Sequence, residues 1–188
     1  AYTCIQKNPL SDAYAFSAIN LIRQYLPRAV QDGKDEEARL AMANASLLAG
    51  VAFSNSMVGI VHAMGHACGG VSRAPHGDCM TILLPYGMEY NLSAVSEYYA
   101  KLLLPLAGAE VYADTPASER ACESIDTVRE MTENFNEICG LPTRLSEVGV
   151  KKDDLPKIAR AAINDGAIIV NPVEASESDV LGILEKAF

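Results

Sequence analysis

All three histidines of this chain fall within residues 61–77, "VHAMGHACGGVSRAPHG". His62 and His66 are four residues apart, so on a helix they project from one face, about 6 Å apart along the axis. His76 follows a Gly–Gly pair, on an expected loop that is short enough to fold back over that face. Three imidazoles that converge in this way can bind one divalent metal ion or line one pocket.

The same spacing also fits a purely structural role. An HxxxH pattern arises by chance in many helices, and a lone buried histidine is more often a hydrogen-bonded core residue than a ligand. The "AMG" between His62 and His66 contains no Glu, which excludes the HExxH zinc hydrolases because they need that Glu as general base. Residues 40–72 carry no charged side chain, and an unpartnered imidazole is costly in such surroundings. That cost favours a functional cluster.

The histidines are expected on and beside a central helix over residues 51–70, which ends at the Gly–Gly pair. Other helices are indicated by apolar residues at three- and four-residue spacing, with N-cap, Pro and Gly signals at their ends. They are predicted over residues 8–27, 34–50, 93–108, 115–140, 153–166 and 176–188. Residues 71–78 are predicted to form a loop, and residues 79–91 fit either helix or strand. The expected fold class is all-α, a multi-helix bundle in one domain of residues 1–188.

Composition limits the possible partners. The formal net charge is −9 and the longest basic run is Lys151–Lys152, so neither nucleic acid nor an anionic membrane is an expected partner. Residues 40–72 are long enough to span a bilayer. They contain Asn, Ser and His side chains, however, and lack flanking aromatic belts and basic loops. We therefore expect buried helices of a soluble protein and no membrane span.

The five cysteines indicate the compartment. Their number is odd, their spacing is irregular and no CxxC is present, which is typical of reduced thiols in a cytoplasmic protein. Cys68 and Cys79 lie near the histidines in sequence. Because they lack the paired spacing of thiolate ligands, we expect them to pack in the core.

Residues 50–91, "GVAFSNSMVGIVHAMGHACGGVSRAPHGDCMTILLPYGMEYN", closely resemble the signature region of the iron-containing (group III) alcohol dehydrogenases. The resemblance includes the HxxxH, the fourteen-residue step from His62 to His76 and the "PHG" that contains His76. It extends to both ends of the chain and covers essentially all 188 residues. It implies the dehydroquinate synthase-like helical domain that forms the C-terminal part of these enzymes. Nothing in the chain resembles their N-terminal dinucleotide-binding domain, so we expect a fragment that is inactive alone.

The resemblance also implies roles for single residues. His62 and His76 match two of the family's metal ligands, and the remaining Asp and His ligands would lie just upstream of Ala1. His66 matches an additional active-site histidine, catalytic and cofactor-binding, which lies near the nicotinamide and helps to relay a proton. Phe53 matches an aromatic position beside the nicotinamide, although a plain core Phe fits the sequence equally well.

The activity implied is the interconversion of alcohols with aldehydes or ketones by hydride transfer to NAD or NADP. Its metal would be Fe²⁺, although such ligands bind Zn²⁺ more tightly by intrinsic affinity. We expect a cytoplasmic homo-oligomer in which this chain is joined by the nucleotide-binding domain. One alternative is a helical scaffold or interaction domain with structural histidines and no catalysis. Another is a free-standing metal protein with three histidine ligands, which would require His66 to turn toward the metal.

Overall fold

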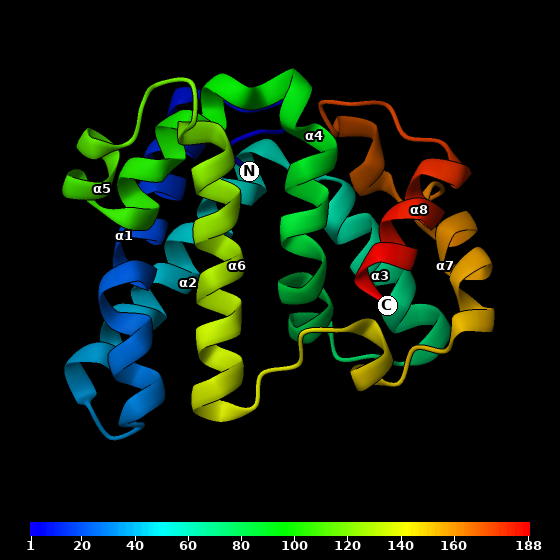
Figure 1. Cartoon of the computed structure of the whole chain (residues 1–188), viewed down its shortest axis with the longest axis horizontal. Coiled ribbons are helices and arrows are strands. Elements are labelled where there is room, and N and C mark those ends of the chain that lie inside the picture. The colour runs from blue at the N-terminus through cyan, green and yellow to red at the C-terminus, as the bar shows by residue number, and fades with distance from the viewer. The chain divides into compact units, whose positions relative to one another are not determined.

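The computed structural model describes residues 1–188, and all of its regular elements are helical (Figure 1). The α-helices are α1 (Pro9–Gln31), α2 (Glu36–Ser56), α3 (Ile60–Ser72), α4 (His76–Ala107), α5 (Ala109–Asp114), α6 (Arg120–Cys139), α7 (Leu155–Ala162) and α8 (Glu177–Ala187). Three short 3₁₀ helices are η1 (Leu145–Val148), η2 (Lys152–Asp154) and η3 (Gly166–Val170). The predicted all-α fold class is confirmed.

Several helix ends follow from local side-chain chemistry. At the start of α1, Asn8 accepts a hydrogen bond from the backbone N–H of Ser11, and the Ser11 hydroxyl accepts one from the backbone N–H of Asn8. Ser176 and Asp179 form the same kind of reciprocal capping box at α8. After α6, Gly140 adopts a φ of +73°, a left-handed conformation that glycine reaches at little cost. The sequence predicted these three ends.

Other predicted boundaries are wrong. α1 continues past Pro27, α2 continues through Gly50, and α3 continues through Gly69 and Gly70. A glycine inside a helix costs only about 1 kcal/mol relative to alanine, so the burial of a helix face outweighs it. α6 begins at Arg120 rather than Thr115, and residues 79–91, which the pattern left undecided, are helical within α4.

The predicted central helix over residues 51–70 is divided between α2 and α3. Met57 has a φ of +69° and Gly59 is extended, which interrupts the helix. The uncharged residues 40–72 therefore belong to two helices. No single helix is long and apolar enough to cross a membrane. α2 and α3 together reach the length and hydropathy of a membrane span, but the chain bends by 105° between them.

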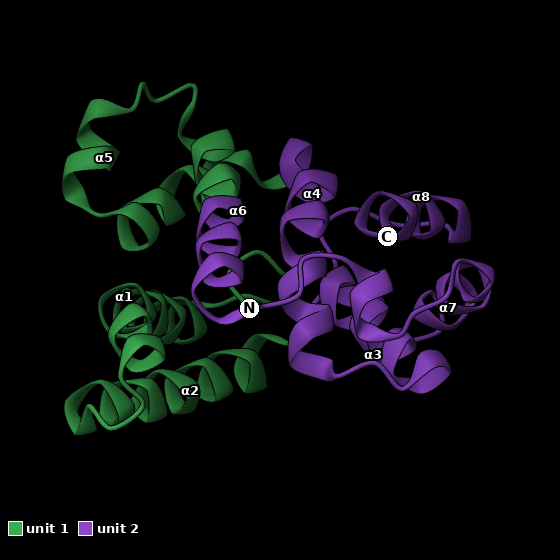
Figure 2. Cartoon of the chain, turned by 60° about the horizontal axis from the view of Figure 1, so that its bottom comes forward, with its two compact units in different colours: residues 1–57, 95–127 green, residues 58–94, 128–188 purple.

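The chain divides into two compact units, residues 1–57 with 95–127 and residues 58–94 with 128–188 (Figure 2). In the first unit, α1 packs along α2. The face of α2 that is buried carries small side chains, Ala38, Ala41, Ala45 and Ala52. Their spacings of three, four and seven place them on one side of the helix, so another backbone can approach closely.

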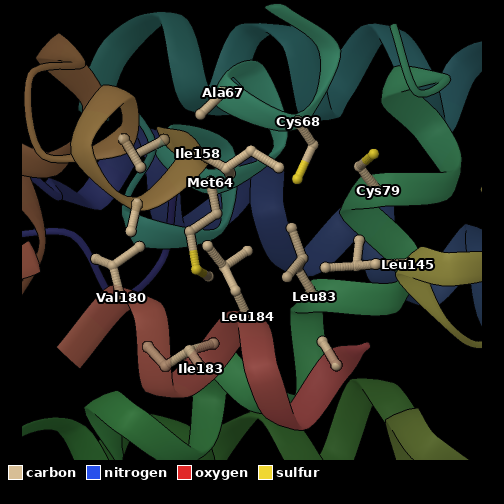
Figure 3. Close-up of a cluster of buried hydrophobic side chains, with 14 of the residues drawn as sticks. Met64, Ala67, Cys68, Cys79, Leu83, Leu145, Ile158, Val180, Ile183 and Leu184 are labelled. Carbon is tan, nitrogen blue, oxygen red and sulfur yellow. The ribbon is translucent and has the colours of Figure 1, made fainter. Parts of the chain in front are cut away.

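In the second unit, α3 packs against α7 and η3, and α7 packs against α8. The core between these elements contains Met64, Leu83, Leu145, Ile158 and Leu184, all buried (Figure 3). They come from α3, α4, η1, α7 and α8 in that order. The helix that carries two of the three histidines is thus fixed on its apolar side by segments from the whole length of this unit.

Candidate functional site

The N-terminus of α3 is held by a side chain from the far end of the sequence. Its N-cap residue, Gly59, provides no side-chain cap. Instead, Asn171 Oδ1 accepts a hydrogen bond from the Ile60 backbone N–H at 3.1 Å, and the amides of Asn171 and Asn91 exchange two more at 2.9 and 2.7 Å. Asn171 is buried, so these bonds satisfy polar groups that water does not reach. A Cβ at Gly59 would lie 2.8 Å from Asn171 Oδ1.

The start of α4 lies beside α3 because glycines let the two helices approach closely. A Cβ at Gly65 of α3 would overlap the Met80 side chain, and a Cβ at Gly87 of α4 would overlap Val61. His76 is the first residue of α4, so its predicted place in a loop is wrong. The connection between the helices is only residues 73–75.

The three histidine rings form a close triangle. The ring centres of His62 and His66 are 5.7 Å apart, those of His62 and His76 are 5.7 Å apart, and those of His66 and His76 are 5.5 Å apart. His62 is half-buried, while His66 and His76 are exposed. The convergence that the sequence predicted is therefore present, built from two helices instead of a helix and a loop.

His62 is uncharged at neutral pH. Burial, and to a lesser degree the neighbouring His66 and His76, lower the pKa of its imidazole from the ordinary 6.5 to about 4. A neutral imidazole keeps a nitrogen lone pair free, which metal coordination requires.

His66 has a polar partner that sequence reasoning missed. Its Nδ1 lies 2.9 Å from Asp165 Oδ2. Asp165 precedes η3 and is 99 residues away in sequence. The only local signal was a turn sequence, "NDG", after α7, and such a sequence does not indicate contact with a histidine.

Cys68 and Cys79 are fully buried in the core of the second unit, with their side chains drawn beside each other in Figure 3. A hydrogen bond with Cys79 and burial raise the pKa of the Cys68 thiol. Both residues pack in the core as predicted, and both thiols are free.

The profile of the family described as "Fe-containing alcohol dehydrogenase family, C-terminal" matches residues 1–188. The chain belongs to this family. Among similar curated proteins, it is 37% identical to the NAD-dependent methanol dehydrogenase of Bacillus methanolicus, with 100% of this chain and 48% of that enzyme covered. It is 38% identical to the 1,3-propanediol dehydrogenase of Klebsiella pneumoniae, with 100% of this chain and 47% of that enzyme covered.

Solved structures of iron-containing alcohol dehydrogenases share the fold. The chain superposes on a crystal structure of 1,3-propanediol oxidoreductase with a TM-score of 0.92 and 36% identity, over 100% of this chain and 47% of the other. The resemblance read from the sequence is therefore confirmed. The chain spans about half the length of the curated relatives that it matches.

The ring-centre distances allow any two of the three histidines to share a metal ion. Two imidazoles on one ion, with metal–nitrogen bonds of about 2.1 Å, place their ring centres roughly 5 Å apart. The ring centres of His62 and His76 are 5.7 Å apart, and those of the other two pairs are 5.7 and 5.5 Å apart. No group of three or more His, Cys, Asp or Glu side chains in the chain is arranged to hold a metal ion. The assignment of His62 and His76 as the metal ligands, with His66 in another role, therefore stays a prediction.

Phe53, the fourth residue singled out from the sequence, lies on α2 in the first unit, whereas the histidines belong to the second. Its side chain is 46% exposed. That exposure argues against a role as a plain core residue, since buried aromatic side chains lose most of their contact with water.

Proposed function

We propose that this chain is the metal-binding, catalytic-site half of an NAD(P)-dependent alcohol dehydrogenase that interconverts alcohols with aldehydes or ketones. The observation that carries the proposal is the triangle of His62, His66 and His76, in a chain that belongs to the iron-containing family. The relatives named for methanol and 1,3-propanediol support an alcohol as the substrate class.

The three histidines take different roles in this proposal. His62 and His76 supply two ligands of a divalent metal ion, Fe²⁺ or Zn²⁺, and the remaining ligands come from residues that precede Ala1. His66, whose Nδ1 contacts Asp165, accepts and passes on the proton that leaves the alcohol hydroxyl. Phe53 presents its exposed ring to the nicotinamide.

When bound, the metal supplies Lewis-acid polarisation of the substrate oxygen and the dinucleotide supplies the hydride acceptor. The complete enzyme then needs a dinucleotide-binding domain, which the family resemblance places before Ala1. We expect this chain alone to be inactive. A cytoplasmic location and a homo-oligomeric state stay predictions, the first supported by five free cysteines.

Alanine substitutions in the complete enzyme separate these roles. His62→Ala and His76→Ala should each remove metal and activity together, because each deletes a ligand. His66→Ala should retain metal and lower the turnover number by roughly 100-fold or more, as expected for loss of a proton-transfer group. Metal content by elemental analysis and alcohol-dependent NAD(P) reduction are measured on the same samples.

Two outcomes would contradict the proposal. Equal loss of metal from all three variants would mean that His66 is a ligand. Full activity in all three would favour the alternative, a helical scaffold whose histidines are structural. The contact of His66 with Asp165 would fit either function, a structural histidine or a proton-transfer group. The activity of His66→Ala therefore decides between the dehydrogenase and the scaffold.

A further inference from the structure

Each carboxylate oxygen of Asp165 contacts a polar partner. Oδ1 accepts a hydrogen bond from the backbone N–H of Ala167 at 2.7 Å, and Oδ2 lies 2.9 Å from His66 Nδ1. The backbone of Asp165 is also held, because its N–H donates to the Ala162 carbonyl and its own carbonyl accepts from Ile168 N–H. The following element, η3, packs against α3. The carboxylate is thus aimed at His66 by the turn between α7 and η3.

This geometry assigns the ring hydrogen of His66. A carboxylate only accepts hydrogen bonds, so the Nδ1 that faces it must carry the hydrogen. A neutral imidazole has one such hydrogen, and Nε2 is then left with the free lone pair. We propose that Asp165 is a positioning residue that fixes His66 in the Nδ1–H tautomer, which keeps Nε2 as the proton acceptor.

The proton-accepting role of Nε2 rests on the function proposed above, whereas the tautomer assignment rests only on Asp165. His66 needs such a partner because its side chain is 45% exposed. The hydrogen bond of one ring nitrogen decides which nitrogen of a neutral imidazole carries the hydrogen, and an exposed ring that lacks such a partner has no fixed tautomer. Asp165, with 25% of its side chain exposed, is the more buried and the better fixed of the two.

Asp165→Asn tests the assignment because it should reverse the tautomer. The backbone N–H of Ala167 still requires an acceptor, so the single amide oxygen of the new side chain takes that place. The amide NH₂ then faces His66 Nδ1 and donates to it, which moves the ring hydrogen to Nε2. The volume and shape of the side chain are almost unchanged.

The tautomer is measured on this chain by NMR of the imidazole ¹⁵N and ¹³C nuclei at about pH 8.5, about two units above the ordinary imidazole pKa. The chain has only three histidines, so His62→Gln and His76→Gln assign the His66 signals. The native chain should show Nδ1–H at His66, and Asp165→Asn should show Nε2–H. Asp154→Asn is the matched control, since that carboxylate contacts Ser72 of the same helix at 3.4 Å. It should leave His66 unchanged.

A native His66 in the Nε2–H form, or an unchanged tautomer in Asp165→Asn, would overturn the proposal. The functional consequence is measured separately in the complete enzyme. Asp165→Asn should lower kcat by roughly 100-fold, comparable to loss of His66 itself, with metal content and KM for the alcohol little changed. Asp165→Glu, which retains a carboxylate, should recover part of kcat.

The tautomer measured by NMR and kcat measured in the complete enzyme separate failure of this inference from failure of the proposed function. If the tautomer reverses and kcat is unaffected, Asp165 positions His66 but His66 does not transfer the proton. If kcat falls while the tautomer stays the same, Asp165 acts in another way and its positioning role is rejected. If Asp165 has only a structural role, Asp165→Asn should change neither the tautomer of His66 nor the ratio of kcat to metal content.

Discussion

His62 is the histidine whose surroundings differ most from water. It lies on the side of α3 that faces the start of α4, and burial together with two neighbouring imidazoles makes its protonated form unfavourable. This is a useful property in a metal ligand, because a proton then competes only weakly for the nitrogen lone pair. Its protonation can be followed directly in a chain with so few histidines.

We predict that His62 in the metal-free chain titrates with a midpoint near pH 4. Between that value and the ordinary 6.5, the unfolded chain binds a proton that the folded chain does not. The free energy of unfolding should therefore fall as the pH is lowered through this window, and be unaffected by His62 above it. Histidine NMR gives the midpoint, and urea unfolding at several pH values gives the stability.

His62→Gln is the control for this pH effect. The variant should lose less stability than the native chain between about pH 6.5 and pH 4, because the group that binds the extra proton on unfolding is gone. An ordinary titration of His62 near pH 6.5 would show that its ring is more hydrated than the structure indicates.

At the scale of elements, the site depends on how closely α4 lies against α3. Gly87 of α4 is buried against Val61, the residue before His62. Val61 is β-branched, so its side chain cannot easily rotate away inside a helix. A larger residue at position 87 must therefore move the helices apart, and this movement would change the distance between His62 and His76.

We predict that Gly87→Ala lowers the free energy of unfolding by about 1–3 kcal/mol, the usual cost of overpacking a core. Gly182→Ala is the matched control, since Gly182 is also inside a helix but a Cβ there meets no atom within 4 Å. That substitution should be neutral or stabilise by up to about 1 kcal/mol through helix propensity. Urea unfolding followed by circular dichroism measures both, and equal effects would mean that α3 and α4 separate without cost.

At the scale of the whole molecule, the proposal makes the chain half of a metal site. A complete site can bind a structural Zn²⁺ with roughly 10–16 kcal/mol, and two of four ligands retain only part of this. We predict that metal added to this chain is removed by dialysis against a mild chelator, and that iron is lost before zinc because its intrinsic affinity is lower. Elemental analysis after dialysis measures what remains.

A longer chain that adds the expected upstream Asp and His should retain one metal ion under the same conditions. This comparison tests the half-site directly. Stoichiometric metal held by the short chain would mean that its own residues complete the site, and the assignment of two ligands to residues before Ala1 would be wrong.

The sequence by itself determined the features that depend on a few neighbouring residues. Asn8 with Ser11 and Ser176 with Asp179 close hydrogen bonds within three residues, so their helix starts could be predicted. The histidines could be found because no other part of the chain contains one and because their spacing resembles one family. The fold class followed from the same helix signals, repeated along the chain.

Only the tertiary structure decided where helices break and which distant residues meet. The sequence predicts a helix end at Gly50, but α2 continues to Ser56 because burial of Ala52 and Ser56 outweighs the small cost of a glycine inside a helix. The first turn of α3 is held by Asn171, more than a hundred residues away. The contact of Asp165 with His66 is likewise set by how η3 packs against α3. Such contacts arise from packing across the chain, and no local pattern encodes them.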